Sequence, residues 1–192
     1  MKQIKNPKFA AGFLVAIAIL ALFGGTHKSL AALSNRVEEQ FYTGVEHKTD
    51  GYTMASIHSQ INAGMDSALV LVAVARNYPE LADKADTLAG CREELFDADD
   101  IYEFNGLTSA MQEAFESLYA SALTVDMSDR DRIVAAACAS DFESVLIYLA
   151  VLAESYNETV NDYWKVSHAF PASVFGRFTD APKYYSFTYV RR

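Results

Sequence analysis

Basic residues are scarce in this chain and form no cluster. Its 192 residues hold 16 Lys and Arg against 25 Asp and Glu, which gives a formal charge of −9. Proteins that bind nucleic acid contact the phosphates through clustered Lys and Arg, so this composition excludes that function class. The length suits one domain with its own core and one additional segment.

Cysteine is scarcer still, since Cys91 and Cys138 are the only two. They lie far apart and lack both the Cys-x-x-Cys spacing of a zinc site and the Cys-x-x-Cys-His spacing of haem attachment. Two interpretations stay open. The residues are isolated buried thiols, which is the commoner outcome, or they pair as a disulfide outside the cell.

Several catalytic and metal-binding motifs are absent as well. The chain has no glycine-rich phosphate loop, no Gly-x-Ser-x-Gly elbow and no EF-hand spacing. A di-iron bundle needs Glu-x-x-His pairs, and the nearest spacing, Glu154 with Asn157, ends in a poor iron ligand. We therefore predict no enzyme activity, no catalytic residue, no metal ligand and no cofactor. The acidic stretch at residues 93–100 is interpreted as a solvated acidic face.

A long uncharged run is present at residues 9–25. At about 1.5 Å per residue, a helix over this run spans about 25 Å, slightly less than the ~30 Å hydrocarbon core of a bilayer. Lys2, Lys5 and Lys8 precede the run, so the N-terminus should stay inside the cell. We predict a short cytoplasmic end at residues 1–8 and a transmembrane signal-anchor helix at residues 9–33.

The rest of the chain would then lie outside the cell as an acidic domain. Two alternatives remain open for the anchor. Residues 29–31 resemble a signal-peptidase site, so cleavage after Ala31 would release a secreted form. The run would otherwise be a core helix of a cytosolic protein, although such helices usually have a polar face.

Apolar residues at steps of three and four predict helices after the anchor. Four coiled-coil-like runs begin at Met54, Leu81, Leu107 and Ala135, and no proline interrupts them. The second run should continue to Tyr102 and close at residues 105–106. The last should form one helix from about residue 128 to 168, with Ser128 in a capping box. The fold class is all-α, an antiparallel helical bundle at residues 34–170.

A motif near the C-terminus carries a family resemblance. The stretch "YNETVNDYWKVSHAFPASVFGRF" at residues 156–178 resembles the C-terminal signature of the LemA family of bacterial envelope proteins. The matching positions are Tyr156, Asn157, Val160, Tyr163, Phe170, Pro171, Gly176 and Phe178. The chain departs from the signature at Trp164, where the family has a second Asn, and it lacks the family's basic stretch. The resemblance implies an antiparallel helical fold and an extracytoplasmic domain, and it implies little about activity.

The C-terminal tail at residues 171–192 is too rich in aromatic residues for a disordered end. We expect it to pack along the bundle. Two other placements stay open, at the membrane interface or as a strand added to another chain.

The favoured function is a non-catalytic interaction or scaffold role in the cell envelope. The expected partners are the membrane, reached through a single-pass anchor, and an envelope protein or a second copy of the chain. One alternative is a ligand-binding or sensor bundle that works through a partner protein. Another is a wall-acting hydrolase, for which no paired-carboxylate motif stands out.

Overall fold

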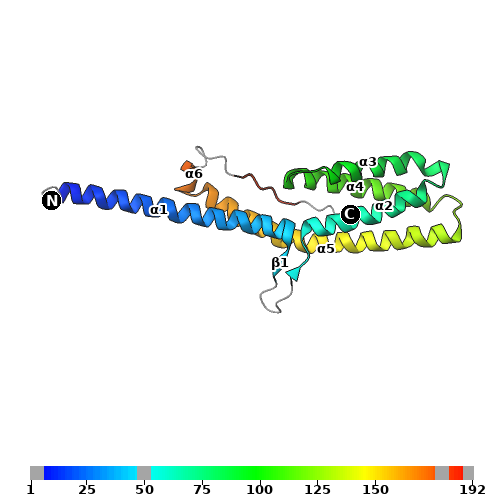
Figure 1. The fold of residues 1–192 in the computed structure, drawn as a ribbon, viewed down its shortest axis with the longest axis horizontal. Helices are drawn as coiled ribbons and strands as arrows, with labels where there is room; N and C mark the ends of the chain where they lie inside the picture. The colour runs from blue at the N-terminus through cyan, green and yellow to red at the C-terminus, as the bar shows by residue number, and fades with distance from the viewer. Residues whose placement is uncertain (1–6, 47–52, 176–181, 188–192) are drawn as a thin grey trace. The chain divides into compact units, whose positions relative to one another are not determined.

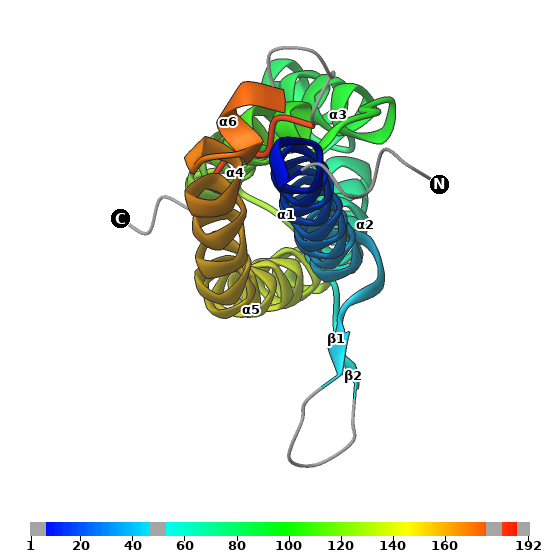
Figure 2. The same ribbon diagram turned by 90° about the vertical axis from the view of Figure 1, so that its left-hand side faces the viewer.

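The computed structural model describes residues 7–46, 53–175 and 182–187, and it shows the predicted all-α fold (Figure 1). The helices are α1 (Pro7–Glu38), α2 (Ile57–Ala75), α3 (Ala82–Phe96), α4 (Ile101–Ala122), α5 (Asp129–His168) and α6 (Ala172–Phe175). A π-helical turn, Glu39–Thr43, follows α1, and a 3-10 turn, Pro79–Leu81, precedes α3. The two-residue strands β1 (Val45–Glu46) and β2 (Thr53–Met54) pair antiparallel, and Figure 2 shows them side by side.

The chain divides into two compact units. Unit 1 consists of Met1–Val37 and Glu158–Lys183, and unit 2 consists of Glu38–Asn157 and Tyr184–Arg192. The helix α5 therefore contributes its first three quarters to unit 2 and its last turns to unit 1. The predicted cytoplasmic end, residues 1–8, lies mostly outside the described residues.

The core of unit 2 forms where α2, α4 and α5 approach closely. Gly64 of α2 is buried, and a Cβ placed on it would lie 3.4 Å from Met111 Cε and 3.5 Å from Phe142 Cε2. The rings of Phe115 and Phe142 stack with their centroids 3.9 Å apart, which joins α4 to α5. The predicted seams of α2 and α5 are buried, whereas Lys84 and Tyr102 of the second predicted run are exposed.

The boundary between α3 and α4 differs from the prediction. The second run does not continue through Tyr102, because α3 ends at Phe96 and α4 begins at Ile101. Asp100 is the N-cap of α4, and its Oδ1 accepts a hydrogen bond of 2.8 Å from the Glu103 backbone N–H. An acidic N-cap satisfies an unpaired N–H group and favours a helix start, so the acids at residues 97–100 begin a helix. Gly106, expected to end a helix, lies exposed inside α4.

The capping box predicted at the start of α5 is confirmed for one of its two hydrogen bonds, because Ser128 caps the helix but its own backbone N–H bonds Tyr78 and not Asp131. Ser128 Oγ accepts a hydrogen bond of 3.1 Å from the Asp131 backbone N–H. Tyr78, in the link after α2, donates its hydroxyl to Asp131 Oδ2 at 2.6 Å and accepts from the Ser128 N–H at 3.0 Å. The hydrogen bond from the Tyr78 hydroxyl lowers the pKa of Asp131 most, and a hydrogen bond from the Ser128 side chain lowers it further. The end of one helix thereby fixes the start of another.

By length and composition, α5 is the one helix in the described part of the chain that is apolar enough to cross a membrane. Of its apolar window, 33% is buried, and Phe142 and Leu149 belong to the core of unit 2. A core helix of a bundle meets the same criteria. Part of the uncharged run at residues 9–25 lies outside the residues whose side chains the structure describes.

Candidate functional site

The motif residues of the last helix fall into both units. Tyr156 and Asn157 belong to unit 2, whereas the motif members from Val160 to Pro171 belong to unit 1. Gly176 and Phe178 lie outside the described residues. The motif therefore does not form one cluster within either unit.

In unit 1 the motif residues lie in the last turns of α5 and directly after it. Val160 is buried, and buried Tyr163 donates its hydroxyl to the Pro182 carbonyl at 2.9 Å. Burial raises the pKa of Tyr163, so its hydroxyl stays protonated and remains a donor. The ring of Trp164 stacks on His168 with centroids 4.7 Å apart. The Phe170–Pro171 peptide bond is cis, with Phe170 exposed and Pro171 buried.

In unit 2 an aromatic cluster surrounds Phe41 of the π-helical turn. The centroid of the Phe41 ring lies 5.5 Å from Phe104 of α4, 6.1 Å from Tyr156 of α5 and 6.4 Å from Phe187 of the tail. Phe41 and Tyr156 are both fully buried. Four segments that are distant in the sequence therefore meet at one apolar centre, where aromatic pairs add to the burial energy.

Polar side chains around this cluster hold the tail. The Asn157 amide brackets the backbone of Phe187, because its Oδ1 accepts from the Phe187 N–H at 2.7 Å and its Nδ2 donates to the Phe187 carbonyl at 2.9 Å. Asn105 Nδ2 donates to the Ser186 carbonyl at 3.2 Å, and the Tyr184 hydroxyl donates to Glu38 Oε1 at 2.6 Å. We call Glu38, Asn105 and Asn157 the tail clamp.

Packing of the tail on the helices is thereby confirmed for its described residues, since Tyr184 and Phe187 are buried. Residues 182–187 form no strand in the described structure. Tyr185 and Tyr102 of α4 are both exposed, and the centroids of their rings lie 4.9 Å apart. The tail thus alternates between buried residues and residues on the surface.

Two buried polar atoms near the cluster have no hydrogen-bond partner among the described residues, Gln40 Oε1 and the Tyr156 hydroxyl. The amide nitrogen of Gln40 donates to Ser155 Oγ at 3.4 Å, and Ser155 directly precedes Tyr156 in α5. The pKa of Tyr156 is raised well above its usual value, mainly by burial and then by Tyr184 and Tyr42. A phenol held neutral in this way is a poor acid or nucleophile.

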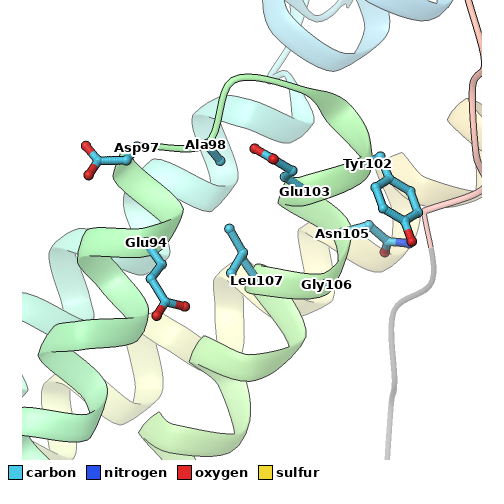
Figure 3. A pocket seen from close by; sticks show the side chains of 8 residues that line it. All are labelled: Glu94, Asp97, Ala98, Tyr102, Glu103, Asn105, Gly106 and Leu107. Atoms are coloured by element: carbon cyan, nitrogen blue, oxygen red, sulfur yellow. The ribbon is translucent and has the colours of Figure 1, made fainter.

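An open hollow of about 710 Å³ lies between the end of α3 and the start of α4 (Figure 3). Its acidic lining residues are Glu94, Asp97 and Glu103. Glu103 Oε2 accepts from the Asp99 backbone N–H at 3.3 Å, so this carboxylate takes part in the helix start. Among the described residues, no group of three or more His, Cys, Asp or Glu side chains is placed to hold a metal ion.

Both cysteines are free, which favours the interpretation as isolated thiols. Cys138 is buried and Cys91 is half-buried. Burial raises the pKa of both thiols, and the charges of Asp141 and Glu94 raise it further. A thiol with a raised pKa is a poor nucleophile at neutral pH.

No family model, curated protein or solved structure matches this chain.

The sequence analysis found Tyr156 and Asn157 but missed Phe41, Glu38 and Asn105. Glu38 and Tyr184 are 146 positions apart, and Asn105 and Ser186 are 81 positions apart. No short motif or helical period relates residues at such separations. The available signal was the aromatic pair Phe41–Tyr42 directly after the long N-terminal helix.

Proposed function

We propose that this chain is a membrane-anchored extracytoplasmic protein, as the resemblance to the LemA family implies, and that its helical bundle acts by binding another protein. The anchor is the N-terminal part of α1. In this proposal residues 1–8 remain inside the cell and unit 2 faces outward.

The observation that carries the proposal is the exposure of large apolar side chains along α1. Phe13, Leu14, Ile17 and Leu22 are 60%, 66%, 46% and 57% exposed. Apolar surface in water is unfavourable by about 25 cal/mol per Å², and a hydrocarbon environment removes that cost. The lysines before the run support an orientation with the N-terminus inside.

A binding role is supported by the surface of unit 2. The stretch of α5 from Val145 to Ala153 has no charged residue, yet Ile147, Tyr148 and Val151 of this stretch are exposed. A helix segment that is apolar on all sides is normally covered.

A second candidate is a ligand-binding bundle that uses the hollow between α3 and α4. The specific observation is a hollow of about 710 Å³ with three carboxylates and Tyr102 in its lining. Such a lining favours an organic cation. Titration of the purified protein with a polyamine would separate this candidate from the favoured one.

Alkaline extraction of membranes from cells that express the chain tests the anchor. The wild type should stay in the membrane pellet. Leu14→Arg/Ile17→Arg should move to the soluble fraction, because each arginine at the centre of a membrane helix costs about 2.5–3.5 kcal/mol.

A matched control is available in unit 2. Leu123 is 66% exposed, the same as Leu14, and Ile133 is also exposed. Leu123→Arg/Ile133→Arg should leave the chain in the pellet. Wild-type protein in the soluble fraction, or a mature form that begins at Ala32, would contradict the anchor.

A further inference from the structure

The tail clamp holds a peptide in a way that combines backbone and side-chain recognition. The side chain of Asn157 contacts both the N–H and the carbonyl of Phe187, and Asn105 contacts the carbonyl of Ser186. These three hydrogen bonds involve only the backbone of the tail. They fix the position and direction of the segment whatever its side chains are.

Two side chains of the tail supply the specificity. Tyr184 and Phe187 are buried, whereas Tyr185 and Ser186 between them are exposed. The Tyr184 hydroxyl meets the Glu38 carboxylate, and the Phe187 ring enters the aromatic cluster beside Phe41. The segment is therefore read as Tyr-x-x-Phe, with a polar anchor at one end and an aromatic anchor at the other.

The clamp residues come from helices and not from loops. Glu38 ends α1, Asn105 lies in the second turn of α4, and Asn157 lies inside the 40-residue helix α5. A site built on helices is held more precisely than a site built on loops.

We propose that the tail clamp is a peptide-binding site for the Tyr-x-x-Phe segment, and that a second copy of this chain supplies the segment in trans. Every contact within unit 2 is kept when the identical segment comes from another copy, as in other exchanges of identical elements. Confinement to one membrane raises the effective concentration of one copy around another. The inference deepens the proposed function by naming the binding site and the partner.

A labelled peptide tests the site in the full-length protein in detergent. Phe187→Ala weakens the chain's own tail and leaves the clamp intact. This variant should bind fluorescent PKYYSFTY, the sequence of residues 182–189, with a rise in anisotropy. Adding Asn157→Asp should weaken binding about tenfold or more, because the Nδ2 donor is replaced by an oxygen that faces the Phe187 carbonyl.

Asn161→Asp is the matched control, because Asn161 is exposed one turn further along the same helix. It should leave peptide affinity unchanged. Every variant should show the circular dichroism spectrum of the wild type. A peptide in which the phenylalanine is replaced by alanine should bind about tenfold more weakly or worse. Absence of binding of PKYYSFTY to a folded Phe187→Ala chain would overturn the site. The assay contains no bilayer, so this failure would leave the anchor untouched.

Mixed copies test the partner. A chain with Asn157→Asp has a sound tail and a spoiled clamp, and a chain with Phe187→Ala has the reverse. Co-expressed with different tags, the two should purify together, whereas two differently tagged copies of either variant should not. Peptide binding without this pairing would overturn the second copy as the partner.

Discussion

At the scale of single residues, the buried polar atoms of unit 2 differ in whether they are satisfied. Asn157 uses both ends of its amide on the tail, whereas the Tyr156 hydroxyl next to it in the sequence has no partner among the described residues. An unsatisfied buried hydroxyl costs about 1–3 kcal/mol. The two residues were both prominent in the sequence motif, but only Asn157 makes a polar contact that explains its residue type.

We predict that Tyr156→Phe leaves the free energy of unfolding unchanged or raises it by about 1 kcal/mol, because the ring keeps its contact with Phe41 and the unsatisfied hydroxyl is removed. Urea unfolding of both proteins measures the difference. A loss of more than 1 kcal/mol would contradict this, since it would mean that the hydroxyl has a partner such as a bound water.

At this scale the sequence predicts only contacts between residues that are close together in the chain. The Ser128–Asp131 capping box was found because its members are three residues apart. Tyr78, which completes the same cap, lies 53 positions from Asp131 and has no signature in the sequence. The same limit applies to the tail clamp, whose members are brought together only by the packing of the helices.

At the scale of the elements, helix existence was predictable and one boundary was not. The helix predicted at residues 128–168 agrees with α5 within one residue at its start and ends at the same residue. The seam also continued across residues 97–100, where the helix stops. Periodicity does not detect a break between two helices that bury the same face, and the N-cap Asp100 was the signal to be followed.

Gly64 offers a test of packing within α2. The added Cβ of Gly64→Ala would make ordinary van der Waals contacts, at 3.4 Å from Met111 Cε and 3.5 Å from Val145 Cγ1. Because glycine lowers helix stability by about 0.5–1 kcal/mol relative to alanine, we predict a rise of that size in the free energy of unfolding.

Gly90→Ala in α3 is the comparison, since a Cβ there meets nothing within 4 Å. Chemical unfolding should show similar gains in the free energy of unfolding for the two variants. A clear loss in Gly64→Ala alone would show that the α2–α4–α5 contact is tighter than described. Gly64→Leu should destabilise strongly in either case, because the site holds no space for a larger side chain.

The junction between Tyr78 and the start of α5 should make stability depend on pH. The pKa of Asp131 is below its usual value of 3.8. The ionised carboxylate therefore stabilises the folded state above that value, and this stabilisation is lost as the pH falls below it. We predict that Tyr78→Phe lowers the urea midpoint at pH 7 and that the difference from the wild type shrinks at pH 3.

Asp131→Asn serves as the control, because an amide at this position has no charge to lose. The difference in urea midpoint between Asp131→Asn and the double variant Tyr78→Phe/Asp131→Asn should be the same at every pH between 3 and 7. A difference between wild type and Tyr78→Phe that is equal at both pH values would refute the link to ionisation.

At the scale of the whole molecule, the all-α class followed from the periodic runs, but the division into two units did not. The helix α5 passes from unit 2 to unit 1 between Asn157 and Glu158 without a proline or glycine. Sequence shows a domain boundary when composition changes or a linker appears. A continuous helix shared by both units gives neither sign.

The central claim, an anchor in α1 with the bundle outside the cell, is tested most directly by mapping lysines on intact cells. Lys2, Lys5 and Lys8 precede the uncharged run, and the exposed Lys84, Lys165 and Lys183 follow it. A membrane-impermeant amine reagent should modify the last three in intact cells and the first three only after lysis, as read by mass spectrometry. Modification of the first three in intact cells, or of none of the six before lysis, would contradict the account.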